Sequence, residues 1–337
     1  MWRRLSRAIR SNFSMPKYSF CNLALESDIP FAELQPIEDP EPEYRIKVGR
    51  GASDDRSCEW LQTWSGQDDK PWLLLGRQAG GYFLRFPGLA DFVVSHDARE
   101  IHCHVVPDTP TKTVRHLILD QVMPLLLSRH GRLVLHGSAV STPQGAIAFI
   151  GQTGWGKSTM AASFSEHGMA VLTDDCLLLQ QNGEYFNVIP SYPGVRLWPD
   201  TALNILGEPR TWTEVAHYTE KKRLAADAGI RFSVWPTALL RVYFLSAPQE
   251  SAKLRVEPLT PRETMLELVR YSYLIDATDR LRLRQEFERL ARFALKPLFY
   301  RLAYAHDFSQ LAQVRRAIIR GSAEYLPACV DSYTAWR

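Results

Sequence analysis

The residues best able to do chemistry in this chain form one short glycine-rich stretch, Gly151-Gln152-Thr153-Gly154-Trp155-Gly156-Lys157-Ser158. The stretch fits the pattern G-x-x-x-x-G-K-[ST], in which glycines let the backbone curl so that successive N–H groups face phosphate oxygens. Lys157 can then reach the β- and γ-phosphates of a nucleotide, and the Ser158 hydroxyl can bind Mg²⁺. We therefore predict an ATP and Mg²⁺ site. The predicted nucleotide contacts are Gly151, Thr153, Gly154, Trp155, Gly156, Lys157, Ser158 and Thr159.

The flanking sequence favours this interpretation over an empty glycine-rich turn. The apolar run 145–150 before the motif predicts a buried strand, and 158–167 after it predicts a helix that ends at Gly168. Strand, glycine loop and helix in this order are the context in which the pattern binds phosphate.

Two adjacent carboxylates, Asp174 and Asp175, interrupt the apolar stretch 170–179, which otherwise predicts one continuous buried strand. Burying an unpaired charge is costly, so the pair needs a reason to be there. Near a phosphate site, one carboxylate can hold Mg²⁺ and the other can align or deprotonate a nucleophile. A turn at a strand end is the alternative. His136, at the end of the strand before the motif, is either a packed residue or one that orients a carboxylate.

The elements around these residues predict an α/β protein in four parts: a basic tail at 1–20, a small β-rich domain at 21–112, a P-loop core at 113–260 and a helical part at 261–337. Residues 20–50 are rich in proline and predict an extended edge or loop. The clearest predicted strands of the β-rich domain, which we expect to be antiparallel, are 72–75, 82–86, 92–94 and 101–105. The predicted helices are 113–129, with a kink at Pro124, then 261–275, 280–295 and 308–320.

Composition limits the remaining possibilities. A net charge of +3 without a strongly basic run does not favour a nucleic-acid partner. The five cysteines are scattered and odd in number, which is typical of reduced thiols in a cytoplasmic protein. We expect no membrane span, because the most apolar helical stretch, 114–127, is short and carries charges. We expect a loose basic tail at the N-terminus and not a secretory signal. Whether the protein forms a homo-oligomer stays open.

The order and spacing of three features resemble the catalytic core of the HPr kinase/phosphorylase family, which shares a P-loop fold with bacterial phosphoenolpyruvate carboxykinases. These features are His136-Gly137, the P-loop and Thr173-Asp174-Asp175. The stretches 135–140 and 193–200 look more like divergent HPr-kinase-like proteins, including those that phosphorylate lasso-peptide precursors. Thr159 stands where the family has an acidic residue, and the N-terminal part does not match the regulatory domain of true HPr kinases. HPr as acceptor and the reverse phosphorolysis therefore stay open.

The resemblance implies roles for individual residues. Asp174 would be the base that takes the proton of an acceptor serine, and His136 would contact it. Asp175 and Ser158 would serve Mg²⁺, while Lys157 would neutralise phosphate charge. Three basic residues become candidates for holding the γ-phosphate or the acceptor: Arg196, Lys222 and Arg223.

The leading hypothesis is thus an ATP-dependent kinase that acts on a serine or other hydroxyl of a peptide or protein, with a lasso-peptide precursor as one possible acceptor. A small-molecule kinase or carboxykinase on the same core is the first alternative. A nucleotide-binding switch without catalysis is the second, since a switch needs a Mg²⁺ carboxylate but no base.

Overall fold

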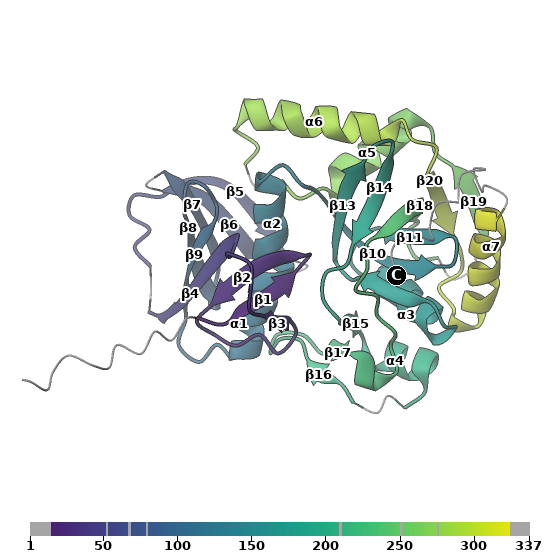
Figure 1. Ribbon diagram of the computed structural model, residues 1–337, viewed down its shortest axis with the longest axis horizontal. Helices are drawn as coiled ribbons and strands as arrows, with labels where there is room; N and C mark the ends of the chain where they lie inside the picture. The colour runs from purple at the N-terminus through teal and green to yellow at the C-terminus, as the bar shows by residue number, and fades with distance from the viewer. Residues whose placement is uncertain are drawn as a thin grey trace, which may run out of the picture.

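The computed structural model describes residues 15–323 except 52, 67–68, 79, 209–210, 250–251 and 275. It is a mixed α/β structure with two large sheets, each covered by helices (Figure 1). Residues 1–14 of the predicted basic tail, and Ile275 at the end of a predicted helix, lie outside the described residues.

The first sheet has nine strands in the order β3-β1-β2-β4-β9-β8-β7-β6-β5. Its strands are β1 Lys17–Phe20, β2 Leu23–Ser27, β3 Gln35–Ile37, β4 Tyr44–Arg50, β5 Glu59–Ser65, β6 Pro71–Gln78, β7 Gly81–Phe86, β8 Ala90–Val94 and β9 Glu100–Val105. The four strands predicted between residues 72 and 105 are confirmed as β6 to β9. Most of their large apolar side chains are buried, and Phe86 and Phe92 are fully buried.

The prediction of an edge or loop for residues 20–50 was wrong. The segment contains β2, β3 and β4, and β4 lies inside the sheet, parallel to both β2 and β9. Tyr44 and Ile46 alternate with polar residues and are buried, which is a strand pattern. The neighbouring prolines Pro36, Pro40 and Pro42 hid that pattern. The sheet is therefore mixed and not purely antiparallel.

One continuous helical segment packs on this sheet. It consists of α1 Thr111–Leu117, the π-helical turn η1 Ile118–Val122 and α2 Met123–Arg129. The predicted kink at Pro124 takes the form of the π-helical turn that precedes it. A proline cannot donate its backbone nitrogen to the preceding turn, so a wider turn at this point fits the sequence. Within that turn, Asp120 is almost completely buried.

The second sheet surrounds the P-loop. Its strands are β10 Leu133–Thr142, β11 Gly145–Ile150, β12 Ala170–Thr173, β13 Cys176–Asn182, β14 Tyr185–Ile189, β18 Thr237–Leu245, β19 Arg255–Pro258 and β20 Phe299–Ala303. β11, β18 and β20 are parallel neighbours, so their carboxyl ends meet at one edge of the sheet.

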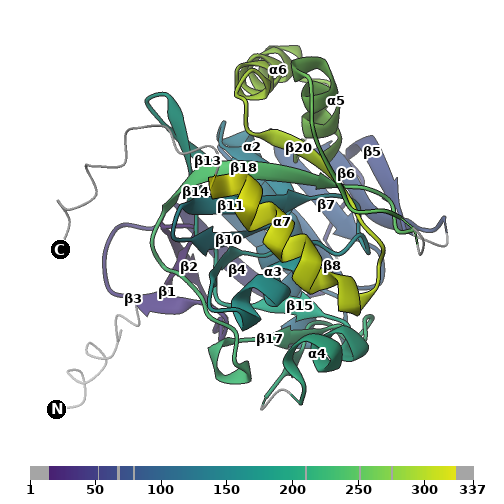
Figure 2. The same ribbon diagram turned by 90° about the vertical axis from the view of Figure 1, so that its right-hand side faces the viewer.

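Helices cover both faces of this second sheet. α3 Lys157–Glu166 and α7 Leu311–Ala323 share one core cluster with it, while α5 Pro261–Tyr271 and α6 Arg280–Ala294 share the other. Figure 2 shows α3 and α7 together on one side and α5 with α6 on another. A small sheet of β15 Val195–Leu197, β17 Lys222–Leu224 and β16 Thr213–Glu214, with the helix α4 Pro199–Leu206, lies next to α3.

The sequence predicted a purely helical C-terminal third, and this prediction was wrong in part. Its three helices are present near their expected bounds, but β20 lies between α6 and α7 and pairs with β18 in the core sheet. β19, which precedes α5, pairs with β20. The polar Arg301 in the middle of a five-residue strand concealed β20. No helix within the described ranges is both long and apolar enough to cross a membrane.

Candidate active site

The glycine-rich loop connects β11 to α3 and opens onto the edge where the parallel strands end. Gly154 and Gly156 have φ angles of +86° and +92°, which side chains rarely adopt. No atom lies within 4 Å of the position that a Cβ on Gly154 would take, so the loop faces open space there. This is the concave, unobstructed backbone that a chain of phosphates requires.

Lys157 lies folded over the loop. Its Nζ donates hydrogen bonds to the carbonyl oxygens of Gly151, at 2.9 Å, and Gln152, at 3.0 Å. Burial lowers the pKa of Lys157, while the charges of Asp175 and Asp174 act in the opposite direction. The ammonium is thus held close to the loop by two weak partners that a phosphate can replace.

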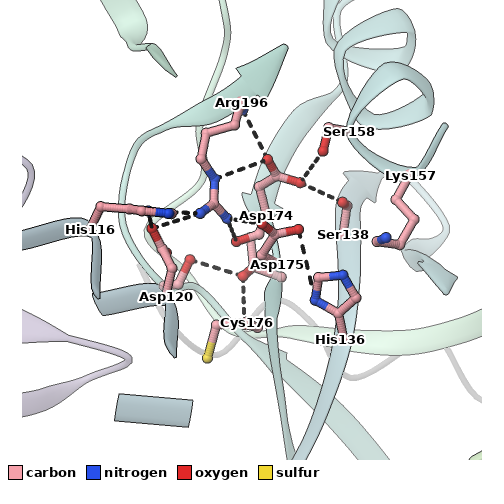
Figure 3. A network of polar contacts seen from close by, with 12 residues as sticks. His116, Asp120, His136, Ser138, Lys157, Ser158, Asp174, Asp175, Cys176 and Arg196 are labelled. Atoms are coloured by element: carbon pink, nitrogen blue, oxygen red, sulfur yellow. Dashed lines mark hydrogen bonds and ion pairs between the residues drawn. The ribbon is translucent and has the colours of Figure 1, made fainter. Parts of the chain in front are cut away.

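The predicted single strand 170–179 is broken at the two carboxylates, and this part of the prediction was wrong. β12 and β13 are separate strands, both paired with β10, and Asp174 and Asp175 form the turn between them. Asp175 has a φ of +66°, a left-handed conformation that costs roughly 1–2 kcal/mol outside glycine. The turn sends the two carboxylates in different directions (Figure 3).

Asp174 points to the P-loop and away from solvent. Its Oδ1 accepts hydrogen bonds from the hydroxyls of Ser158, at 2.8 Å, and Ser138, at 2.5 Å, and its Oδ2 accepts one from the backbone N–H of Arg196 at 2.9 Å. The residue is only 2% exposed. Burial, and then the neighbouring charge of Asp175, raise the pKa of Asp174. Its oxygens are therefore committed to anchoring Ser158 and the surrounding strands.

Asp175 faces the other way, with 23% of its side chain exposed. Its Oδ2 forms an ion pair with the guanidinium of Arg196, and its Oδ1 lies 3.9 Å from Nδ1 of His136. Burial disfavours its charge, but Arg196, His136 and Lys157 together hold the pKa of Asp175 below its usual range. Asp175 is therefore ionised and accessible.

His136 was expected to contact Asp174, and here the structure differs. Its carboxylate neighbour is Asp175, and its Nδ1 also lies 3.3 Å from the hydroxyl of Tyr273. Burial lowers the pKa of His136 to about 4, so the ring is neutral at pH 7. A neutral imidazole beside Asp175 can orient a hydroxyl group by hydrogen bonding without competing for its charge.

Arg196, predicted to hold phosphate or acceptor, is buried and already paired. Besides Asp175 it contacts Oδ2 of Asp120 through Nη1 at 2.6 Å. Asp120 also accepts a 2.6 Å hydrogen bond from the Tyr192 hydroxyl and lies 2.7 Å from Nδ1 of His116. Sequence reasoning missed Asp120, whose only signal was a lone carboxylate in an apolar helix. The placement makes Arg196 a positioning residue for Asp175.

The two other basic candidates also lie apart from the loop. Arg223 is buried against Glu33, with Nη1 2.6 Å from a carboxylate oxygen, and Lys222 lies 3.9 Å from Glu214. Their neighbour Lys221 does reach the site, where it stands 5.7 Å above the ring of Trp198. Lys221 is thus the residue of this basic run that is placed to meet a phosphate.

One cleft, with a volume of about 1270 Å³, is bordered by several of these groups: His136, Lys157, Ser158, Asp175, Arg196 and Lys221. Asp120, Asp174 and Arg223 are buried and do not line it. Its floor is the P-loop with Thr153, Gly154, Gly156, Lys157, Ser158 and Thr159, next to His136 and Asp175. The lining also includes residues of β5 and β6, residues near the end of α5, and the segment that follows β20. Of the predicted nucleotide contacts, Trp155 instead packs against the core cluster beneath α3, and Gly151 is buried beside it.

The donors beside the loop suit Mg²⁺ bound with a nucleotide. Within the described ranges, no three His, Cys, Asp or Glu side chains converge on a point that could hold a metal ion. Mg²⁺ at phosphate sites takes one or two protein oxygens and fills its octahedron with phosphates and water. The Ser158 hydroxyl and the Asp174 carboxylate, 2.8 Å apart, supply hard oxygens of this kind.

Comparisons with known proteins find a distant structural similarity. No protein-family model matches the chain, and no curated protein matches it. Among solved structures, the chain is similar to the HPr(Ser) kinase/phosphatase from Coxiella burnetii. That similarity has 12% sequence identity and a TM-score of 0.27, and it covers 57% of this chain and 99% of that one. The structural similarity is distant, so function is inferred below from the geometry of the site.

Proposed function

We propose that this protein is an ATP-dependent phosphotransferase that moves the γ-phosphate to a hydroxyl group of a peptide or protein. The observation that carries the proposal is that the two adjacent carboxylates point to different places. Asp174 is bonded to the P-loop Ser158, whereas Asp175 faces the cleft next to His136. A nucleotide switch needs the first arrangement, but a second, ionised carboxylate in the open cleft serves a nucleophile.

Geometry supports an exchange of the roles that the family resemblance implied for the two carboxylates. Asp174 would act with Ser158 in holding Mg²⁺, since its oxygens point to that hydroxyl. Asp175 would receive the acceptor hydroxyl, since this carboxylate is exposed to the cleft and that of Asp174 is not. The acceptor oxygen attacks the γ-phosphorus, the bond to the leaving nucleoside diphosphate breaks, and the hydroxyl proton passes to Asp175.

The low pKa of Asp175 is compatible with this role. A carboxylate that binds protons weakly is a poor base in an early, fully deprotonating step. Phosphoryl transfer passes through a loose transition state in most analyses, in which the nucleophile is aligned before it loses its proton. Asp175, fixed by Arg196 on one side and next to His136 on the other, would therefore act mainly by orienting the acceptor.

The lining of the cleft favours a peptide over a small molecule. It includes the aromatic side chains of Trp64, Trp72 and Tyr218. Trp64 belongs to β5, an edge strand of the nine-stranded sheet, and such an edge can bind an extended peptide through its backbone. A lasso-peptide precursor is one acceptor of this kind.

The test is transfer of labelled γ-phosphate from ATP to serine-containing peptides, with free serine and glycerol as small acceptors. We expect labelled peptide, lost in Lys157→Ala and strongly reduced in Asp175→Asn. Labelling of the small acceptors alone would favour a small-molecule kinase. ATP binding without transfer, combined with an unchanged basal hydrolysis rate in Asp175→Asn, would favour the nucleotide switch.

A further inference from the structure

The segment that follows β20 lies beside the P-loop because of the strand order. β20 and β11 both run parallel to β18, so the chain leaves β20 at the edge where the P-loop leaves β11. The contact is close: a Cβ on Gly156 would lie 2.8 Å from the hydroxyl oxygen of Tyr304 and 3.7 Å from a ring carbon of His306. Glycine at this position is thus required both by its positive φ and by these rings.

The segment presents aromatic rings to the cleft in an ordered way. Tyr304 is 5% exposed, and its ring stacks on that of His306 with centroids 5.0 Å apart and planes inclined by 18°. His306 is exposed, and Phe308, two residues on, is 38% exposed. All three residues line the cleft. Partial burial lowers the pKa of His306, so its ring is neutral at pH 7. The buried tyrosine therefore supports an uncharged, flat surface that other rings can stack on.

We propose that this aromatic segment, Tyr304 to Phe308, binds the purine base of the nucleotide. The inference rests on the proposed use of ATP. In the proposed complex the base stacks on the outer face of His306, with Phe308 completing the apolar wall and Tyr304 fixing the imidazole from behind. Rings bind bases through their π-faces, and the larger purine gains more from such stacking than a pyrimidine does.

The position of the segment relative to the phosphates favours a base over an acceptor peptide. In a P-loop the backbone cradles the α- and β-phosphates, whereas the lysine and the following serine mark the γ-phosphate end. Tyr304 and His306 adjoin Gly156 in that backbone. Asp175, which would receive the acceptor, has its contacts with Arg196 and His136 instead. The nucleoside therefore lies toward β20, and the acceptor enters from the side of Asp175.

The decisive experiment compares nucleotides with a ligand that has phosphates but no base. Calorimetry would measure binding of ATP, CTP and inorganic tripolyphosphate, each with Mg²⁺, to the parent protein and to His306→Ala, Phe308→Ala and His306→Phe. The matched control is Tyr185→Ala, which removes an exposed aromatic side chain of β14 that does not line the cleft.

We expect His306→Ala to weaken ATP binding by about tenfold or more, as loss of one base-stacking ring does. Phe308→Ala should weaken it less. Tripolyphosphate binding should not change in either variant, and the preference for ATP over CTP should shrink. His306→Phe should restore ATP binding, because it keeps a flat ring, and Tyr185→Ala should bind ATP like the parent.

Three results would overturn the proposal. The first is an ATP affinity that is unchanged in both His306→Ala and Phe308→Ala, and the second is an equal loss of ATP and tripolyphosphate affinity in these variants. The third is a KM for the acceptor peptide that rises in these variants while their KM for ATP is unchanged. Failure of the proposed function looks different. In that case ATP and tripolyphosphate would still bind to the parent protein, but no labelled γ-phosphate would reach a peptide, whatever the His306 variants do.

Discussion

Nη1 of Arg196 lies 2.6 Å from Oδ2 of Asp120, and both side chains are buried. This ion pair joins the helix on the nine-stranded sheet to the turn that carries the two catalytic candidates, because the same guanidinium also holds Asp175. Burial disfavours charge on both, yet their mutual attraction lowers the pKa of Asp120 and raises that of Arg196. Arg196 thus connects the helix on the first sheet to the candidate active site.

Asp120→Asn is expected to destabilise the fold strongly. It leaves Arg196 with one carboxylate fewer in a buried position, and breaking a buried ion pair from one side typically costs about 3–5 kcal/mol. Urea unfolding would measure the change. Glu288→Gln, which breaks an exposed pair with Arg284, is the control and should cost less than about 1 kcal/mol. Equal midpoints for the two variants would contradict the coupling.

Lys157→Ala should lose ATP binding and turnover while the protein stays folded. Among the described residues, the ammonium donates hydrogen bonds to two backbone carbonyls of its own loop, so we do not expect the core to depend on it. Calorimetry and phosphate release would measure the loss, and circular dichroism the fold. Lys222→Ala is the matched control, since that side chain lies near Glu214 and outside the cleft. Parent-like turnover in Lys157→Ala would disprove the phosphate site.

The two carboxylates should give separable defects. Asp175→Asn should retain binding of ATP with Mg²⁺ but slow phosphate transfer by about 10²–10⁴-fold, the usual worth of a group positioned on the reacting proton. Asp174→Asn should raise the Mg²⁺ concentration needed for half-maximal activity, because an amide is a poorer ligand for a hard cation. Single-turnover transfer at varied Mg²⁺ distinguishes them. The reverse pattern would restore the assignment implied by the family resemblance.

His136 should make the stability of the nucleotide-free protein depend on pH. Its folded pKa, about 4, is below the usual 6.5, so the unfolded chain binds more protons between these values. Its stabilising contribution is complete above pH 6.5 and is lost as the pH falls toward 4. The loss is on the order of 2 kcal/mol, because part of the ring is exposed. Denaturant unfolding of His136→Gln should show a flatter profile over this range than the parent. Parallel pH profiles of stability for the variant and the parent would show that His136 does not cause this pH dependence.

Local patterns predicted the parts of the site that are close in sequence. The P-loop, its strand and its helix occupy one continuous stretch, and loop geometry is encoded by the spacing of Gly151, Gly156 and Lys157. The pairing of Arg196 with Asp120 was not predictable, because the residues are far apart in sequence and Asp120 belongs to no motif. The place of β4 and β20 in a sheet is likewise set by distant partners, and their local patterns were hidden by nearby prolines and by Arg301. Separation in sequence and masked local patterns together limited the prediction.

The position of β20 has a consequence for synthesis of the protein. On the ribosome, the P-loop strand β11 emerges about 150 residues before β20, whose sequence follows two helices. A nascent chain that already contains the whole glycine motif still lacks the strand beside β18 and the rings that follow it. We therefore expect the chain to bind nucleotide only after the segment through Phe308 has been synthesised. Chains released early, before Phe308, would carry an intact motif without a competent site.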